Sequence, residues 1–143
     1  MFMTEKNNHQ KPRILVCDDE KNMRFLLTDL MEEEGWGVTA CENGRVAIEQ
    51  LEERGREFPV MVVDLSMPEV DGFGVIKRAR ELHLDGSIIV LTAYGTIDTA
   101  VRAMQAGADD FLVKPFENAH LKSRVRLALE SRDLMEQAEL SHP

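Results

Sequence analysis

The chain has 143 residues, of which 43% are apolar and 30% charged, and this composition is typical of one folded domain rather than of a disordered segment. Its 26 acidic and 17 basic side chains give a formal net charge of −9, which argues against binding to a nucleic-acid backbone or to an anionic membrane. Its apolar runs are too short to span a bilayer, and two cysteines are too few for a disulfide framework or a metal cluster, so we expect a cytoplasmic location.

Short apolar runs alternate with segments of helical periodicity along the chain. The expected strands are Arg13–Cys17, Gly37–Cys41, Val60–Val63, Ser87–Leu91 and Asp110–Val113. The expected helices are Lys21–Glu34, Gly44–Arg54 with Asn43 as its cap, Phe73–His83, Thr96–Ala106, and a last helix from Glu117 to about Leu140. The alternation predicts an α/β fold, a doubly wound five-stranded parallel sheet with helices on both faces.

Polar side chains follow four of the five expected strands. Asp18 and Asp19 come after the first strand, Asp64 after the third, Thr92 after the fourth and Lys114 after the fifth. Each has an ordinary explanation when taken alone, such as helix capping for an aspartate or solvation for a surface lysine. The carboxyl ends of parallel strands meet at one edge of a sheet, where such folds bind ligands, so we expect these five side chains to lie close together.

This set of residue types suits phosphoryl transfer. Carboxylates that converge repel one another and raise each other's pKa, and a divalent cation with a preference for oxygen ligands, Mg²⁺ or Mn²⁺, removes that repulsion. A lysine and a hydroxyl at the same edge provide partners for phosphate oxygens. The pattern therefore indicates Asp64, at the end of a fully apolar strand, as a nucleophile for a phosphoryl group.

The chain resembles the receiver domains of bacterial two-component response regulators. The segments that carry the resemblance are "ILVCDDE", "VVDLSMPEVDGFGV", "IIVLTAYG" and "GADDFLVKPF". The stretch from "LTAYG" to "KPFE" is most similar to the nitrogen-regulation (NtrC-like) subgroup, whose members activate sigma-54-dependent transcription. The resemblance implies the flavodoxin-like strand order 2-1-3-4-5, with residues 1–12 as a disordered tail, residues 13–126 as the receiver domain and residues 127–143 as a helical extension or linker.

For the metal, the resemblance implies that Asp19 and Asp64 bind Mg²⁺ directly together with the backbone carbonyl of Ser66. Asp18 is expected to act mainly through a bound water. Asp64 is also the expected phosphoacceptor.

For the switch, the resemblance implies that Thr92 hydrogen-bonds the attached phosphoryl group and that Lys114 forms an ion pair with it. The peptide bond between Lys114 and Pro115 is expected to be cis. Phe111 takes the position of a switch aromatic that is more often tyrosine in this family.

The implied function is a signalling switch rather than a conventional enzyme. A partner sensor histidine kinase, or a small donor such as acetyl phosphate, transfers a phosphoryl group to Asp64, and the domain catalyses this modification and its slow reversal. The face formed by 96–106, 110–113 and the last helix then changes and controls dimerisation and a transcriptional output.

The chain contains no G-x-x-x-x-G-K-[ST] motif, so we expect an output ATPase or DNA-binding domain to be absent from it. Leu127, Leu134 and Ala138 fall nearly a heptad apart, which indicates either a coiled dimeric linker or a frayed amphipathic tail.

Three other readings remain at this point. An aspartate-nucleophile phosphatase of the haloacid dehalogenase type places a second acid two residues after the nucleophile, where this chain has Ser66. A flavin-binding module of similar strand order needs hydroxyls or glycines after the first strand, where this chain has "DDEKN". A receiver-like domain that works without phosphorylation is disfavoured, because every expected acidic, hydroxyl and lysine position is filled.

Overall fold

The computed structural model describes residues 11–141 and the side chains of residues 11–134. Its centre is a parallel sheet with strand order β2-β1-β3-β4-β5, so the predicted fold is confirmed. The strands are β1 (Arg13–Cys17), β2 (Gly37–Cys41), β3 (Val60–Asp64), β4 (Ser87–Thr92) and β5 (Asp110–Val113). Residues 1–10 of the expected N-terminal tail lie outside the described part of the chain.

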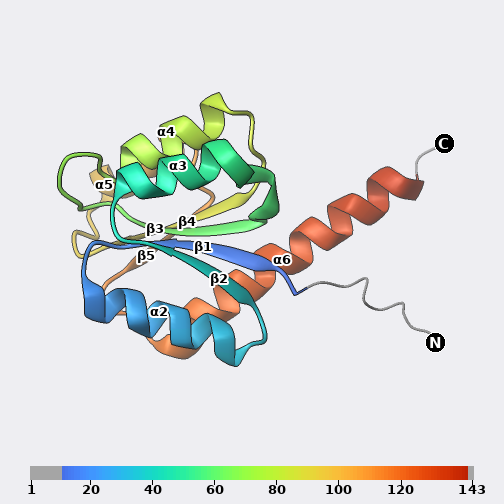
Figure 1. The fold of residues 1–143 in the computed structure, drawn as a ribbon, viewed down its shortest axis with the longest axis horizontal. Coiled ribbons are helices and arrows are strands. Elements are labelled where there is room, and N and C mark those ends of the chain that lie inside the picture. Colours follow the sequence, from blue (N-terminus) through green and yellow to red (C-terminus); the bar gives the residue numbers. More distant parts are fainter. Residues whose placement is uncertain (1–10, 142–143) are drawn as a thin grey trace.

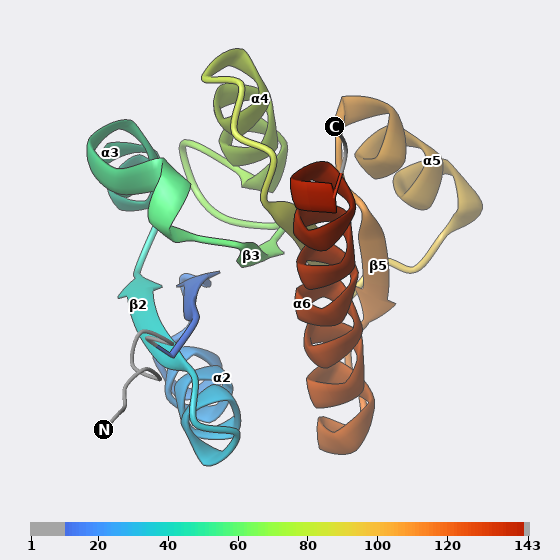
Figure 2. The same cartoon turned by 90° about the vertical axis from the view of Figure 1, so that its right-hand side faces the viewer.

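Helices cover both faces of the sheet, as Figures 1 and 2 show. They are α2 (Lys21–Glu33), α3 (Gly44–Arg54), α4 (Gly72–Glu81), α5 (Ile97–Ala106) and α6 (Asn118–Ser141), with a 3-10 turn η1 (Gly55–Glu57) after α3. Helices α3, α4 and α5 pack on one face, and α2 and α6 pack on the other. Among the described residues, no helix combines the length and the hydropathy needed to cross a bilayer.

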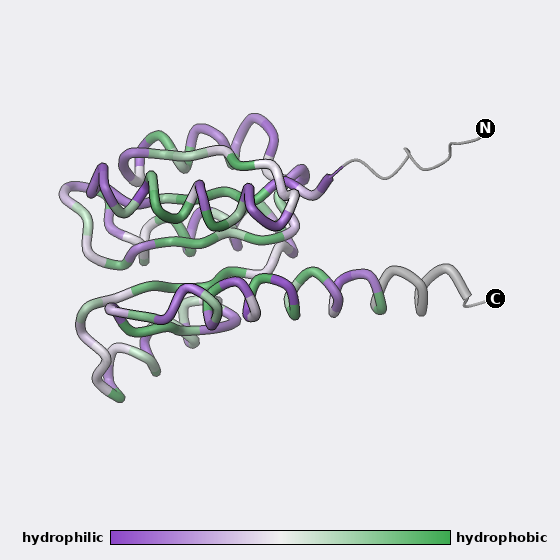
Figure 3. Tube along the Cα trace, turned by 90° about the horizontal axis from the view of Figure 1, so that it is seen from below, coloured by the Kyte–Doolittle hydropathy of each residue, from purple (hydrophilic) through white to green (hydrophobic). Residues whose placement is uncertain are grey.

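The central strands consist almost entirely of apolar residues, because each strand contributes to two cores. Hydrophobic residues are green along the trace in Figure 3. In β1, Leu15 and Cys17 pack with α3, α4 and α5, whereas Ile14 and Val16 pack with α2 and α6. All five residues of β3 are buried, up to and including Asp64. A carboxylate that ends such a strand is thereby held at the edge of the sheet with little contact with water.

Side-chain caps fix where three helices begin. Asn43, Asp71 and Thr96 each accept a hydrogen bond from the backbone N–H three residues later. The predicted Asn43 cap is confirmed. The cap at Asp71 makes Gly72 the first residue of α4 instead of part of the preceding turn, and a Cβ at Gly72 would collide with the backbone carbonyl of Asp64.

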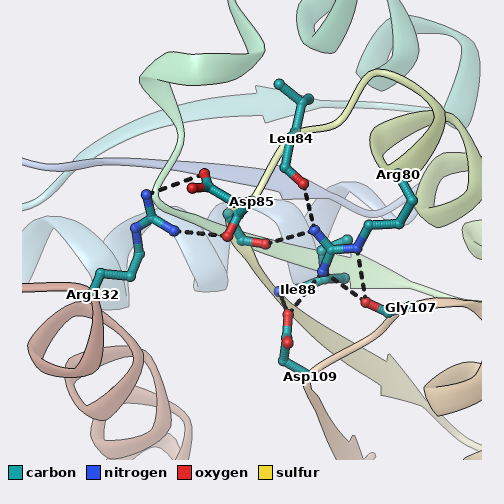
Figure 4. A network of polar contacts seen from close by, with 8 residues as sticks. Arg80, Leu84, Asp85, Ile88, Gly107, Asp109 and Arg132 are labelled. Carbon is teal, nitrogen blue, oxygen red and sulfur yellow. Dashed lines mark hydrogen bonds and ion pairs between the residues drawn. The ribbon is translucent and has the colours of Figure 1, made fainter. Parts of the chain in front are cut away.

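Helix α6 runs beyond the edge of the sheet at which the strands begin and is tied there by a polar network (Figures 1 and 4). The Arg132 guanidinium donates to the backbone carbonyl of Asp85 at 2.7 Å. Arg80 donates to the neighbouring carbonyl of Leu84 at 2.7 Å and to that of Gly107 at 2.7 Å. The loop between α4 and β4 is therefore held from two sides, by α4 and by α6.

The two faces of α6 differ in burial. Leu121 and Val125 are fully buried against the sheet, whereas Leu127 and Leu134 are mostly exposed. The side chain of Ala138, the third member of the predicted heptad series, lies outside the described residues.

Candidate functional site

The ends of four strands bring the predicted site residues to one edge of the sheet. Cys17, the last residue of β1, pairs in register with Val63, so Asp18 follows directly beside Asp64. Thr92 closes β4 and pairs with Val113, which places Lys114 one residue beyond the end of β5. The parallel registers therefore assemble side chains that are distant in the sequence.

Three of these side chains form an acidic cluster. Asp18, Asp19 and Asp64 each offer one carboxylate oxygen, and these oxygens all lie within 4.8 Å of one another. Asp18 is fully buried, Asp64 is 5% exposed and Asp19 is exposed. The cluster thus has two buried carboxylates and one that faces solvent.

Backbone hydrogen bonds hold the two buried carboxylates in place. Asp18 Oδ1 accepts from the N–H of Glu20 at 2.9 Å, and Asp64 Oδ1 accepts from the N–H of Ser66 at 3.1 Å. The N-cap residue of α2 is Glu20, which makes no side-chain capping bond, so neither Asp18 nor Asp19 is the cap of that helix. The capping explanation for these aspartates is therefore wrong.

Lys114 contacts both buried acids. Its Nζ lies 3.0 Å from Asp18 Oδ2 and 3.5 Å from Asp64 Oδ2. Burial alone lowers the pKa of Lys114, but the hydrogen bond and charge of Asp18, with the charge of Asp64, outweigh it and raise that pKa. The peptide bond between Lys114 and Pro115 is cis.

The pKa of Asp64 is raised. Burial is the largest cause, the Lys114 ammonium acts in the opposite direction, and the negative charges of Asp18 and Asp19 raise the pKa further. One ammonium facing three carboxylates leaves an excess of negative charge at this edge. A donor set made only of carboxylate oxygens, with this excess charge, fits a hard divalent cation such as Mg²⁺ or Mn²⁺.

Of the predicted switch residues, Thr92 lies at the strand ends that form the cluster, and Phe111 lies two residues before Val113 on β5. Thr92 is buried, and its Oγ1 accepts from the N–H of Tyr94 at 3.0 Å. Phe111, on β5, is half-buried and packs against the core beneath α3, α4 and α5. Ser66, the predicted backbone ligand, is exposed beside the cluster.

One positioning residue of the site was not predicted. Arg24, on α2, donates from Nη1 to the backbone carbonyl of Asp18 at 3.0 Å and so braces the loop that carries the first two aspartates. No signal in the sequence singles out this arginine from the other basic residues on helix surfaces.

Comparisons with known proteins agree with this fold and identify the family. The family model for the response regulator receiver domain matches residues 14–126. The probable transcriptional regulator ycf27 of the alga Pyropia yezoensis is 37% identical over 126 residues, which are 87% of this chain and 50% of that protein. The regulatory protein AtoC of Escherichia coli (strain K12), an NtrC-like protein, is 32% identical over 130 residues, 91% of this chain and 28% of its own length. The signal receiver domain of a putative Luxo repressor protein from Vibrio parahaemolyticus superposes with a TM-score of 0.83 at 32% identity, covering 91% of this chain and 98% of that one.

The fold is of the flavodoxin-like class, and the family match identifies a module of two-component signalling. This chain belongs to the response regulator receiver domain family of two-component systems, as its sequence predicts. The chain spans about half the length of the ycf27 regulators that it matches.

Proposed function

We propose that the chain is a phosphoryl-accepting switch in which Asp64 takes a phosphoryl group from a phosphohistidine of a partner sensor histidine kinase, or from a small phosphodonor. The observation that carries this proposal is the placement of the Asp64 carboxylate. It is 5% exposed, within 4.8 Å of two further carboxylates and 3.5 Å from the Lys114 ammonium. A carboxylate in such surroundings is costly unless a cation shares the site.

The step is an in-line displacement. A carboxylate oxygen of Asp64 forms a bond to phosphorus while the bond from phosphorus to the donor nitrogen breaks, and the electron pair of that bond returns to the imidazole nitrogen. The hydrogen bond from Ser66 holds Oδ1 of Asp64, and Lys114 binds the phosphoryl oxygens. Water later hydrolyses the acyl phosphate, so the chain catalyses its own modification and slow reversal without turning over a separate substrate.

The residues that would hold Mg²⁺, or Mn²⁺ in its place, are Asp18, Asp19, Asp64 and the backbone carbonyl of Ser66, with Asp18 acting mainly through water. When bound, the ion neutralises charge on the transferring group. The all-oxygen donor set and the surplus negative charge of the cluster support this assignment.

Phosphorylation is proposed to change one face of the domain. The phosphoryl group adds about −1.5 to −2 charges and new acceptor oxygens, and Thr92 and Lys114 satisfy them by moving toward Asp64. Phe111 then fills the space that the loop after β4 leaves. The face formed by α5, β5 and α6 changes shape as a result, by a coupling of about 1–3 kcal/mol.

The proposed partner for this face is a second copy of the chain. Ile97, Val101 and Met104 lie along α5 at helical spacing and are 81%, 46% and 45% exposed, and Val113 beside them on β5 is 43% exposed. Ile97→Asp is expected to abolish dimerisation of the phosphorylated chain, measured by sedimentation, without preventing the phosphorylation of Asp64. Leu134→Asp tests the coiled linker separately, and unchanged sedimentation would remove that linker from the proposal.

The proposed output is control of transcription in the cytoplasm. The ycf27 relative is named as a probable transcriptional regulator, and the chain covers half of its length. No phosphate-loop motif occurs in the chain, so the ATPase or DNA-binding activity is assigned to a separate domain or protein. The net charge of −9 supports a role without direct contact to nucleic acid or membrane.

The test is phosphoryl gain measured by intact mass. Wild-type protein incubated with acetyl phosphate and Mg²⁺ is expected to gain one phosphoryl group, and Asp64→Asn is expected to gain none. An equal gain in both proteins would refute the assignment of the acceptor, and a full gain in the presence of a metal chelator would refute the assignment of the ion.

A further inference from the structure

An open cleft of about 550 Å³ lies beside the acceptor, between the loops that follow β3 and β4. Ser66 and Thr92, which belong to the phosphorylation site, are among its lining residues. Phe73 of α4 and Arg102 of α5 line it as well, together with Tyr94 and Asp71, whose carboxylate accepts the hydrogen bond that caps α4. The cleft is therefore continuous with the site, and it carries an arginine that the proposed reaction has not used.

Arg102 is held in the cleft by an aromatic ring and has no acidic partner among the described residues. Its guanidinium carbon lies 4.2 Å from the centroid of the Phe73 ring, a cation–π contact that holds the side chain beside that ring. Six of the other ten described arginines form ion pairs with carboxylates, whereas Arg13, Arg24, Arg54 and Arg56 form none, and among these unpaired arginines only Arg102 lines the cleft. Its donors are therefore available to an anion that enters the cleft.

The leaving group of a phosphodonor is a candidate for such an anion, because in-line transfer fixes the side of phosphorus from which it leaves. The leaving group of a phosphodonor lies on the side of phosphorus opposite the attacking Asp64 oxygen, outward from the carboxyl ends of the strands. The residues that follow β3 and β4 at that edge are the ones that line the cleft. A small leaving group that passes Ser66 and Thr92 on its way out enters the cleft that Arg102 also lines.

We propose that Arg102 is a specificity-determining residue of the phosphorylation reaction and that its guanidinium favours acyl phosphates over phosphoramidates as small donors. This inference rests on the proposed function of Asp64. With an acyl phosphate, the bond from phosphorus to the acyl oxygen breaks and its electron pair stays on that oxygen, so the leaving carboxylate gains a full negative charge. With phosphoramidate, the bond from phosphorus to a protonated nitrogen breaks, and neutral ammonia leaves. Only the first leaving group develops a charge with which Arg102 can pair.

The experiment compares both donors on the same variants, with Mg²⁺ present and phosphoryl gain followed by intact mass over time. Arg102→Gln removes the charge and keeps most of the side-chain length, and Arg102→Lys restores a positive charge. Arg56→Gln, on the exposed η1 turn at the opposite edge of the sheet, is the matched control for the loss of one arginine. Arg102→Gln is expected to slow the reaction with acetyl phosphate by about fivefold to tenfold, since the cleft is open to solvent and the contact is weaker than an enclosed oxyanion contact.

The ratio of the two rates decides the outcome. The inference predicts that phosphoramidate reacts with Arg102→Gln within about twofold of wild type, and that Arg102→Lys and Arg56→Gln resemble wild type with both donors. Equal slowing with both donors, or no slowing with acetyl phosphate, would overturn the role of Arg102 and leave the role of Asp64 intact. No phosphoryl gain by the wild-type chain from either donor would refute the proposed function, and this inference with it.

Discussion

Lys114 Nζ lies 3.0 Å from Asp18 Oδ2, although 96 positions separate the two residues in the chain. Asp18 is fully buried, and the Lys114 side chain is 17% exposed, so this is an ion pair with little solvent around it. Lys114 is closer to Asp18 than to Asp64, the proposed acceptor. The ammonium therefore bridges the two buried carboxylates, and in the proposed function it would shift from Asp18 toward a phosphoryl group on Asp64.

Removing the ammonium is expected to destabilise the protein when no metal is present. Lys114→Met leaves the buried Asp18 carboxylate without its partner, and loss of one member of a buried pair costs about 3 kcal/mol. Urea denaturation in a metal chelator measures this change, with Lys77→Met on the exposed face of α4 as the control. Adding Asp18→Asn to Lys114→Met is expected to restore most of the loss, and a double variant no more stable than Lys114→Met would contradict the pairing.

Removing the acceptor charge is expected to have the opposite effect. The pKa of Asp64 is raised in the folded protein, mainly by burial. Ionised Asp64 therefore lowers the free energy of unfolding at a pH above its folded-state pKa. This loss of stability disappears as the pH falls toward the pKa that Asp64 has in the unfolded chain. Asp64→Asn should therefore raise the free energy of unfolding at pH 7 by on the order of 1 kcal/mol, and by less at about pH 4. Mg²⁺ should narrow the difference at pH 7. A variant that is less stable than wild type at pH 7 in chelator would show that the carboxylate is not strained there.

The two thiols are expected to be inert in the folded protein. Burial raises the pKa of Cys41 to about 12 and raises that of Cys17 further, and both side chains are fully buried. A disulfide reagent that reacts with thiolates should modify neither cysteine at pH 8 in buffer and both in denaturing urea. Rapid modification of one cysteine in the native protein would mean that the outer strand β2 separates locally from β1.

The local stability of the last turns of α6 is expected to depend more on Arg132 than on the Asp85 side chain. The shorter hydrogen bond of Arg132 goes to the backbone carbonyl of Asp85, at 2.7 Å, and the carboxylate lies 3.4 Å away and is 89% exposed. Arg132→Ala should therefore speed amide hydrogen exchange in the last turns of α6 by about fivefold, the equivalent of one hydrogen bond of about 1 kcal/mol. Asp85→Ala should change it by less than about twofold, because an exposed ion pair contributes little. Equal effects of both substitutions would show that the carboxylate provides the contact.

The sequence predicts the framework of this protein well because the framework follows from local patterns. Asp64 ends an apolar run, and Asn43 stands before a segment of helical periodicity. The parallel order of the strands then predicts, without any distances, that the residues after the strands meet at one edge of the sheet. Helix ends were less accurate: α4 ends at Glu81 and not at His83, because His83 has a left-handed backbone with a φ of 58°. Asp71 and Thr96 are both cap residues, so α4 begins one residue earlier and α5 one residue later than periodicity indicates.

What the sequence could not predict depends on contacts between distant side chains. The complete burial of Asp18, the bracing of its loop by Arg24 and the hold of Arg80 on two separate turns all join positions that no local pattern links. The stacking of Arg102 on Phe73 is of the same kind, because it depends on how α4 and α5 pack. The roles of Ser66, Thr92 and Phe111 stay predictions, because they concern the phosphorylated state.

Chemical trapping of the modified residue tests the central claim most directly. Borohydride reduces the acyl phosphate of an aspartate to homoserine and so marks the residue that carried the phosphoryl group. After incubation of the wild-type chain with phosphoramidate and Mg²⁺, followed by reduction, peptide mass mapping is expected to find homoserine at position 64 alone. Homoserine at position 18 or 19, or a phosphoryl gain that leaves position 64 unmarked, would contradict the account.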